Sequence, residues 1–428
     1  MTAEHHHVLT CDLAMRSHYT PSRQHFALIK PASTNDSAST VLPWLFSSLA
    51  GIDVNKAAAQ CNLDQLRHLA SIISQRALQC HQVHASFALT DIRFCGWQSD
   101  LVSDQAARNF EWEKHLWRWV VRAFKRELFL SQPCISDPLR CRSIGFLDIG
   151  ANIGDWLTPL RLSLPYVPIL GVEGSPANVA LATANIAESV RHVRQTSMGQ
   201  VAPTRIMPYA MLSPVELRAA HHAGGLCFSR GLQKTSNIGE HGLPLTVDDH
   251  HTLRAAMQSC PIKAQVAGTT LGTVLQTMSV PPSVFIVKMD IEGHELHALS
   301  TIADAWSERP PCFVIIEFTM TGPSQAWSNA TLRMLVHSTG YDAMWLNVPG
   351  SDSQWSRQPP AQPSFVAQQG LDRNHLETAM VAGLQREFNQ VAVAWEVAGK
   401  RSRYDEWYLD AIVGFRERQK CIRSLLSG

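Results

Sequence analysis

Two acidic residues end short apolar runs in the first half of the chain, and both stand where a carboxylate can bind a ligand. Asp148 leads into a turn that contains Gly150 and Gly154, and Glu173 ends a second run about twenty-five residues later. Glycines allow positive φ and leave space for a ligand beside the backbone amides. A carboxylate at the second position can accept both ribose hydroxyls of an adenosine cofactor. The pair therefore predicts a nucleoside-binding site.

The glycine spacing separates one adenosine cofactor from another. The turn from Gly150 to Gly154 lacks the Gly-x-Gly-x-x-Gly pattern that lets a backbone approach a pyrophosphate. A dinucleotide is therefore disfavoured. S-adenosylmethionine carries no phosphate and needs acceptors for its ammonium and ribose groups, which Asp148 and Glu173 offer. Ser175 and the proline after it suit the start of a helix, so the second turn is also well specified.

A third group of ionisable side chains directly follows a buried apolar run. Its members are Lys288, Asp290, Glu292, His294 and Glu295. At the carboxyl edge of a sheet, such a group can supply a general base. We expect Asp290 or His294 to remove a proton from the acceptor, with Glu317 at the next strand end in reserve. The alternative is an ordinary helix start, because the two glutamates of the group complement a helix N-terminus.

Metal binding is a further possibility for this group. Carboxylates suit hard divalent cations, and Asp290, Glu292 and His294 could hold one. We do not favour this hypothesis, and activity that survives a chelator would exclude it. The ten cysteines contain no Cys-x-x-Cys and none of the spacing that tetrahedral zinc requires. We therefore expect no metal site.

The candidate residues need a sheet that holds them at one edge. From Ile144 onward, short apolar runs alternate with helical stretches, which is typical of parallel strands joined by crossover helices. The predicted strands are Gly145–Ile149, Pro168–Glu173, Thr204–Ala210, Val284–Asp290, Phe313–Phe318 and Tyr341–Val348. Near-continuous apolar content fits strands that are covered on both faces. We expect a doubly wound, mostly parallel α/β sheet.

The motifs and their order resemble the FkbM-type S-adenosylmethionine-dependent methyltransferases. The matching segments are FLDIGANIG at 146–154, GVEGSPAN at 171–178, YAMLS at 209–213, KMDIEGHE at 288–295 and FVIIEF at 313–318. The resemblance covers about half of the chain. It implies the class I methyltransferase fold and, commonly, methyl transfer to a hydroxyl oxygen.

The resemblance also implies roles for single residues. The residues that match the cofactor-binding positions are Asp148, Gly150, Ala151, Asn152, Gly154, Glu173, Ser175 and Ala210. The late motif is matched by Lys288, Asp290, Glu292, Gly293 and Glu295. With Glu317 and His294, Lys288 and Asp290 form the candidate catalytic set.

Four regions are expected along the chain. Residues 1–50 read as a poorly ordered leader, 51–135 as a helical N-terminal region and 136–350 as the cofactor-binding domain. Residues 351–428 read as a linker and a mainly helical extension, although the segment 388–397 equally suits a strand. A helix predicted over about 104–130 is rich in tryptophan and arginine. The spacing of its apolar residues indicates that this helix packs against a neighbouring domain, and contact with a membrane surface is the weaker interpretation.

Composition bounds the partners and the compartment. The 37 Lys and Arg residues nearly balance 36 Asp and Glu residues, so no strong field favours nucleic acid. The scattered cysteines predict reduced thiols, with a Cys134–Cys141 bridge as a minority alternative. No signal peptide or membrane-spanning segment is evident, which predicts a cytoplasmic protein without integral membrane contact. The oligomeric state does not follow from the sequence.

The residues thus predict an S-adenosylmethionine-dependent enzyme that methylates a small-molecule, sugar or lipid hydroxyl. Two alternatives remain open. The first is a module that binds the cofactor without chemistry, and the second is a nicotinamide-dependent oxidoreductase, which the glycine spacing disfavours.

Overall fold

The three-dimensional structure is a computed structural model of the chain. It describes the residues 51–196, 200–223, 226–227, 265–277, 283–291, 294–302, 306, 310–319, 324–346, 365–366, 372–397 and 408–426. The predicted leader over 1–50 and most of the predicted linker after residue 350 lie outside these ranges.

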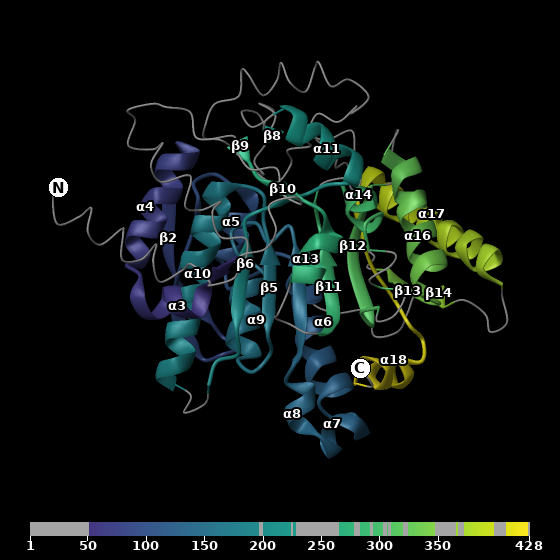
Figure 1. Cartoon of the computed structure of the whole chain (residues 1–428), viewed down its shortest axis with the longest axis horizontal. Helices are drawn as coiled ribbons and strands as arrows, with labels where there is room; N and C mark the ends of the chain where they lie inside the picture. Colours follow the sequence, from purple (N-terminus) through teal and green to yellow (C-terminus); the bar gives the residue numbers. More distant parts are fainter. Residues whose placement is uncertain are drawn as a thin grey trace. The chain divides into compact units, whose positions relative to one another are not determined.

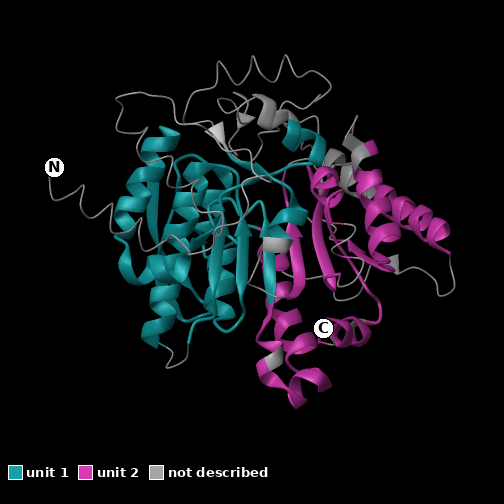
Figure 2. Ribbon diagram, viewed as in Figure 1, with its two compact units in different colours: residues 1–112, 145–282 teal, residues 113–144, 283–428 magenta. Residues whose placement is uncertain are grey.

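The chain divides into two compact units (Figure 2). Unit 1 comprises residues 1–112 and 145–282, and unit 2 comprises residues 113–144 and 283–428. Each unit consists of two separate stretches of the chain. The domain boundaries predicted at residues 135 and 350 stay predictions.

The sheet of unit 1 contains three parallel strands, as the apolar runs predict. They are β4 (Ile144–Ile149), β5 (Ile169–Val172) and β6 (Thr204–Met207), in the order β6-β5-β4. Figure 1 shows β5 beside β6. Every residue of β4 and β5 is buried, which agrees with apolar runs covered on both faces. The two-residue β1 (Ile52–Asp53) extends the edge in the antiparallel sense beside β6.

Helices surround these strands. They are α3 (Val54–Gln60), α4 (Leu63–Ser74), α5 (Leu101–Ala106), α9 (Leu157–Ser163), α10 (Pro176–Thr196), α11 (Pro214–Ala223) and α13 (Leu271–Thr277). The 21-residue α10 contacts α3, α4 and α9, and most of its side chains are buried. Its run of alanines lets neighbouring elements approach closely. Two short strand pairs complete the unit: β7 (Ala210–Met211) with β10 (Gly268–Thr269), and β8 (Leu226–Cys227) with β9 (Gln265–Val266).

A β-hairpin lies within the region predicted to be helical. Strands β2 (Leu78–Ala85) and β3 (Thr90–Trp97) pair along eight residues each, so the helical prediction is wrong for this segment. The reason is that β2 alternates weakly between apolar and polar residues, and most of it stays partly or fully exposed. The buried strand is β3, whose inner side chains Ile92, Phe94 and Trp97 pack into unit 1.

Unit 2 contains a mixed sheet in the order β11-β12-β15-β13-β14. Its strands are β11 (Ser283–Met289), β12 (Phe313–Thr319), β13 (Ala343–Leu346), β14 (Phe365–Val366) and β15 (Tyr408–Gly414). Strands β11 and β12 are parallel, and β15 runs antiparallel to both β12 and β13. Three predicted strands are confirmed, but β15 falls where the sequence predicts helix. The segment 388–397, which also suited a strand, lies in helix α17 (Arg373–Val397).

The remaining helices of unit 2 pack on this sheet or extend from it. They are α6 (Lys114–Arg122), η2 (Ala123–Leu128), α7 (Gln132–Ser136), α8 (Pro138–Cys141), α14 (Glu295–Leu299), α16 (Ser324–Thr339) and α18 (Arg418–Leu426). The rings of Trp119 and Phe124 lie edge-on against Phe313 and Phe285 at centroid distances of 5.1 and 5.2 Å. The single helix predicted over about 104–130 is wrong, because α5 ends at Ala106 and α6 begins at Lys114. The tryptophan-rich part packs against strands of its own unit, whereas the sequence predicts packing against a neighbouring domain.

The cysteines overturn one prediction. Disulfides join Cys80 to Cys95, Cys134 to Cys141 and Cys312 to Cys421, and Cys61 is also disulfide-bonded. Among the described cysteines none is a free thiol. The sequence does not reveal the long-range pairs, because Cys312 and Cys421 are brought together only by the fold. Among the described residues, no helix combines the length and apolar content needed to cross a bilayer.

Candidate functional site

The turn after β4 adopts the backbone shape that its glycines predict. The φ angles are +91° at Gly150, +46° at Asn152 and +79° at Gly154. The amides of Gly150 and Ala151 both donate to the Val172 carbonyl, at 2.8 and 2.9 Å, which fixes the turn against the end of β5. A Cβ atom at position 154 would also lie 3.1 Å from Ile186 Cγ1. Both conformation and space therefore favour glycine there.

Glu173 is joined directly to this turn. One carboxylate oxygen accepts a hydrogen bond from the Asn152 amide at 2.9 Å, and the other accepts one from the Ser175 amide at 2.7 Å. Each carboxylate oxygen has a second lone pair with which it can accept another hydrogen bond. The two amides thus orient Glu173 and leave it able to bind hydroxyl groups.

The electrostatics of Glu173 are unusual for a carboxyl. Burial raises its pKa to about 7, and the hydrogen bonds from Ser175 and Asn152 oppose part of this rise. The negative charges of Asp148 and Asp155 raise the pKa further. Asp148 itself is buried, with 1% of its surface exposed. The sequence prediction that Asp148 and Glu173 come together at one strand edge is thus met in the structure.

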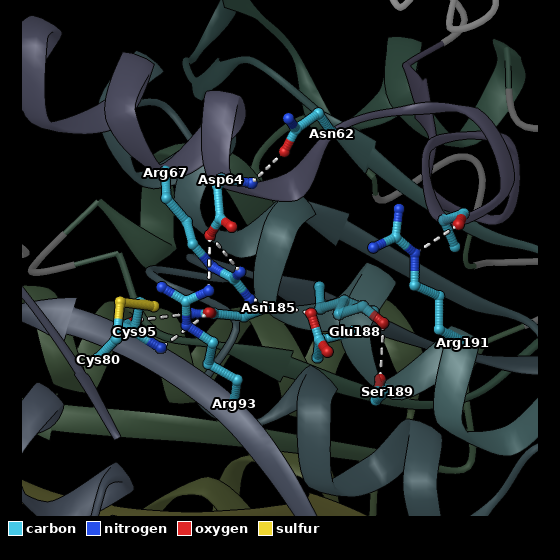
Figure 3. A network of polar contacts seen from close by, with 12 residues as sticks. Asn62, Asp64, Arg67, Cys80, Arg93, Cys95, Asn185, Glu188, Ser189 and Arg191 are labelled. Atoms are coloured by element: carbon cyan, nitrogen blue, oxygen red, sulfur yellow. Dashed lines mark hydrogen bonds and ion pairs between the residues drawn. A yellow bond between two sulfur atoms is a disulfide. The ribbon is translucent and has the colours of Figure 1, made fainter. Parts of the chain in front are cut away.

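Two asparagines of α10 form hydrogen bonds to the turn after β4. Asn178 on α10 donates to Asn152 Oδ1 at 3.0 Å and accepts from the Trp97 indole at 3.0 Å. Asn185, two helical turns later, donates to the carbonyls of Ile153 and Cys95 and accepts from the Cys95 amide. Figure 3 shows Asn185 reaching the hairpin beside the Cys80–Cys95 disulfide.

Ion pairs attach helix α4 to helix α10 and to strand β3 of the hairpin. Asp64 accepts hydrogen bonds from Arg67 and Arg93, and Arg67 also pairs with Glu188 on α10 at 3.1 Å (Figure 3). Arg67 is almost fully buried, so its two acidic partners offset the cost of removing its charge from water. The unpredicted hairpin and α4 therefore brace α10, which carries the asparagines behind the turn.

Two other predicted cofactor residues lie in unit 1. Ser175 stands at the entry of α10, where its hydroxyl accepts from the Asn178 amide at 3.4 Å, as expected of a cap. Ala210 lies in β7, which pairs with β10 and not with β5. Among the described hydrogen bonds, none joins Ala210 to Glu173 or to the glycine turn. Its assignment to the cofactor site stays a prediction.

In unit 2, Lys288 and Asp290 form an ion pair. The Lys288 ammonium lies 2.9 Å from Asp290 Oδ2, and the Lys288 side chain is almost completely buried. A buried ammonium is stabilised by an acidic partner, and the ion pair with Lys288 fixes the orientation of the Asp290 side chain. This pair supports a positioning role for Lys288 beside the proposed base.

A carboxylate that the sequence did not reveal lies beside this pair. Glu317 is the register partner of Asp410 on β15, and Asp290 follows Met289, which pairs with Ile316. Three acids thus stand in one row across β11, β12 and β15. Burial raises the pKa of Asp410 to about 7, Asp290 adds to the rise, and Lys288 opposes it. No local signal marks Asp410, because its neighbours in the row are far away in sequence.

The rest of the late motif divides between structural and undescribed residues. Glu295 accepts a hydrogen bond from the Ile291 amide at 3.0 Å, which supports the helix-start interpretation for this residue. His294 precedes α14 as its N-terminal flanking residue, and its ring lies 5.6 Å from that of His297. Glu292 and Gly293 lie outside the described residues. The hypothesis of a cation held by Asp290, Glu292 and His294 is therefore untested.

The side chains around the turn suit an adenosyl cofactor that has no phosphate groups. Asp148 and Glu173 present acidic oxygens, which match hydroxyl and ammonium donors and would repel a pyrophosphate. Gly150 and Gly154 keep the turn free of large side chains. Among the described residues of the turn and of the β5–α10 connection, none is basic. The residues therefore fit a cationic cofactor better than an anionic one.

The comparisons with known proteins cover part of the chain with a family model. No curated protein matches the chain. One solved structure that resembles it is phosphoethanolamine N-methyltransferase 2 of Haemonchus contortus in complex with S-adenosyl-L-methionine, with 10% identity and a TM-score of 0.26. The alignment covers 89% of this chain and 83% of the other, but a likeness this distant carries no argument. A family model described as "Methyltransferase FkbM domain" matches residues 148–343. Over these residues, a little less than half of its length, the chain is similar to the FkbM methyltransferase domain.

Proposed function

We propose that the chain is an S-adenosylmethionine-dependent methyltransferase that methylates a hydroxyl group of a small molecule, a sugar or a lipid. The observation that most supports this cofactor is the pair of hydrogen bonds that the Asn152 and Ser175 amides donate to the Glu173 carboxylate. These bonds set an acidic side chain, able to accept two hydroxyl groups, beside a turn of glycines. Bound S-adenosylmethionine would supply an electrophilic methyl group.

In this proposal Glu173 binds the ribose hydroxyls and Asp148 faces the positive end of the cofactor. The backbone of the turn shapes the groove for the remainder of the ligand, because positive φ at Gly150 and Gly154 turns the chain sharply after β4. The protein contributes alignment and exclusion of water, since methyl transfer needs no covalent intermediate on the enzyme.

Asp290 is the proposed proton acceptor. It follows a parallel strand, as Asp148 and Glu173 do, and residues at the carboxyl ends of such strands are those that meet ligands in doubly wound sheets. The ion pair with Lys288, at 2.9 Å, orients the Asp290 side chain. Asp410 is a positioning residue in this scheme, His294 is the alternative base and Glu317 stays the reserve base.

The other functions are less well supported. A nicotinamide-dependent oxidoreductase would need a turn that approaches a pyrophosphate, and the turn from Gly150 to Gly154 lacks the Gly-x-Gly-x-x-Gly pattern for it. A module that binds the cofactor without chemistry would need no ion pair at Asp290, which favours an enzyme. The similarity to the FkbM methyltransferase domain agrees with the enzyme.

The compartment needs a revised proposal. The sequence predicts a cytoplasmic location because no signal peptide or membrane-spanning segment is evident, and it predicts reduced thiols, but the described cysteines are paired instead. Disulfides form and persist mainly in oxidising environments. We therefore favour an oxidising compartment for this protein.

Calorimetric titration with S-adenosylmethionine, S-adenosylhomocysteine and NAD tests the cofactor. We expect the first two to bind and NAD not to bind. Release of labelled methyl groups to extracts of small molecules, sugars and lipids then identifies the acceptor. The Asp290→Asn variant should bind the cofactor normally and lose about 100-fold or more in turnover. Unchanged turnover would remove Asp290 from the mechanism, and tight binding of NAD alone would overturn the methyltransferase.

A further inference from the structure

A basic groove lies in unit 2 between helices η2 and α18, which contact each other. Its volume is about 480 Å³. The charged side chains that line it are Arg126, Glu127, Arg416, Glu417, Lys420 and Arg423. Four of these six are basic and two are acidic, so the lining carries two more positive than negative charges.

The basic side chains are available to a ligand. Arg126, Lys420 and Arg423 are exposed. The Nε atom of Arg416 is buried and has no hydrogen-bond partner in the described part of the chain, while its backbone amide donates to Asp342 at 2.7 Å. The hydrogen bond to Asp342 fixes the backbone of Arg416 at the groove. An anion with several oxygens, such as a phosphate ester, would suit this arrangement.

Exposed aliphatic side chains lie next to the groove. Helix α7 contacts both α8 and α18, and the segment around these short helices exposes Leu130, Ile135 and Leu139 by 67%, 57% and 76%. In the described part of unit 2, these three are the large apolar side chains that stand exposed. Single exposed leucines are common, but three within ten residues form a patch that needs an explanation.

The patch and the groove belong to one covalently braced end of unit 2. The Cys134–Cys141 disulfide closes the segment of α7 and α8, and Cys312–Cys421 ties α18 to the residue before β12. Glu317 and Asp410 stand at the opposite end of β12 and β15. The groove is therefore separate from the row of acids.

We propose that this end of unit 2 docks onto a membrane that contains anionic phospholipids. The basic groove would take a lipid phosphate, and Leu130, Ile135 and Leu139 would enter the boundary between headgroups and acyl chains. Basic residues beside exposed aliphatic residues are the combination that binds such an interface. A nucleic acid would use the charges alone, and a protein partner would need no phosphate group. The proposal does not depend on the methyltransferase activity.

Co-sedimentation of the full chain with vesicles tests the proposal. We expect binding to vesicles of phosphatidylcholine with phosphatidylserine and little binding to phosphatidylcholine alone. Each basic residue near an anionic surface contributes roughly a fivefold gain in partitioning, so Lys420→Gln with Arg423→Gln should weaken binding about 25-fold. Leu139→Ser should weaken it at least about threefold, because a buried aliphatic group is removed.

Matched variants in unit 1 provide the controls. Lys56→Gln with Arg108→Gln removes the same charge from two exposed positions, and Leu89→Ser removes an aliphatic group that is 87% exposed. Both should bind vesicles as the unchanged protein does. Affinity for S-adenosylhomocysteine and the thermal unfolding midpoint, measured for every variant, report whether the fold is intact.

Three results would overturn the proposal. The first is no preference for anionic vesicles. The second is an equal loss of binding in the unit 1 controls, which would mean that only net charge matters. The third is saturable binding of inorganic phosphate that Lys420→Gln with Arg423→Gln abolishes, together with no vesicle binding, which would mean an ion site and not a membrane surface.

Discussion

Glu173 should make the affinity for the cofactor depend on pH in a calculable way. The ionised carboxylate can accept hydrogen bonds from both ribose hydroxyls, whereas protonation turns one of its oxygens into a donor. Because burial raises the pKa of Glu173 to about 7, binding near neutral pH requires the loss of a proton. The affinity should therefore rise as the pH rises through about 7.

The magnitude follows from the ionised fraction of one group. With a pKa of about 7, roughly one tenth of the Glu173 carboxyl is ionised at pH 6 and roughly nine tenths at pH 8. The apparent dissociation constant is inversely proportional to the binding-competent fraction, so it should fall about tenfold over this range. Near pH 7, binding should release about half a proton per ligand.

Isothermal titration calorimetry with S-adenosylhomocysteine at pH 6, 7 and 8 measures both quantities, in two buffers that differ in ionisation enthalpy. The matched control is Glu173→Gln, which cannot titrate. Its affinity should be weaker by about 10- to 100-fold, because a charge-assisted hydrogen bond is lost. The ionisable groups of the ligand titrate identically in both cases, so the ratio of the two affinities isolates Glu173. A ratio that does not change with pH would refute the role given to Glu173.

Three further results are expected. Gly154→Ala should lower the free energy of unfolding by about 1–2 kcal/mol in chemical denaturation, because an L-residue is strained at φ +79°; an unchanged midpoint would show that the turn relaxes. Without ligand, stability should fall as the pH rises from about 4 to about 7, since the folded forms of Glu173 and Asp410 hold protons more tightly than the unfolded chain. A Glu173→Gln, Asp410→Asn double variant with the same pH profile would contradict this. Replacing both Cys312 and Cys421 by serine should cost about 4–5 kcal/mol, because the bridge closes a loop of 109 residues, and unfolding by urea with and without the pair would measure it.

Sequence reasoning succeeded where the determinants are local. Asp148, the glycine turn and Glu173 follow directly from short motifs, because each strand end and the turn after it are set by a few adjacent residues. The parallel strands of both units were predicted for the same reason, since most of them are short runs dominated by apolar residues. Lys288 and Asp290 are two residues apart, so their ion pair also lies within reach of the sequence.

Features that depend on distant parts of the chain were missed. Asp410 joins the row of acids only because β15 pairs with β12 in the antiparallel sense, more than ninety residues away in sequence. The hairpin of β2 and β3 lacks a strong alternating pattern, yet it carries Trp97, which bonds Asn178 behind the turn. The disulfides depend on which cysteines the fold brings together, and spacing alone does not reveal this.

A thiol count tests the compartment. Titration of the protein isolated under non-reducing conditions, unfolded in guanidinium, should find no free thiol at Cys80, Cys95, Cys312 or Cys421 by mass spectrometry of alkylated peptides. Alkylation of all four positions would restore the prediction of reduced thiols and a cytoplasmic location.

The most direct test of the proposed function is a crystal structure of the chain with S-adenosylhomocysteine. We expect both ribose hydroxyls within hydrogen-bonding distance of the Glu173 carboxylate and the amino acid end of the ligand beside the turn after Asp148. A nucleoside bound away from Glu173, or no binding at saturating ligand, would contradict the cofactor site proposed for this protein.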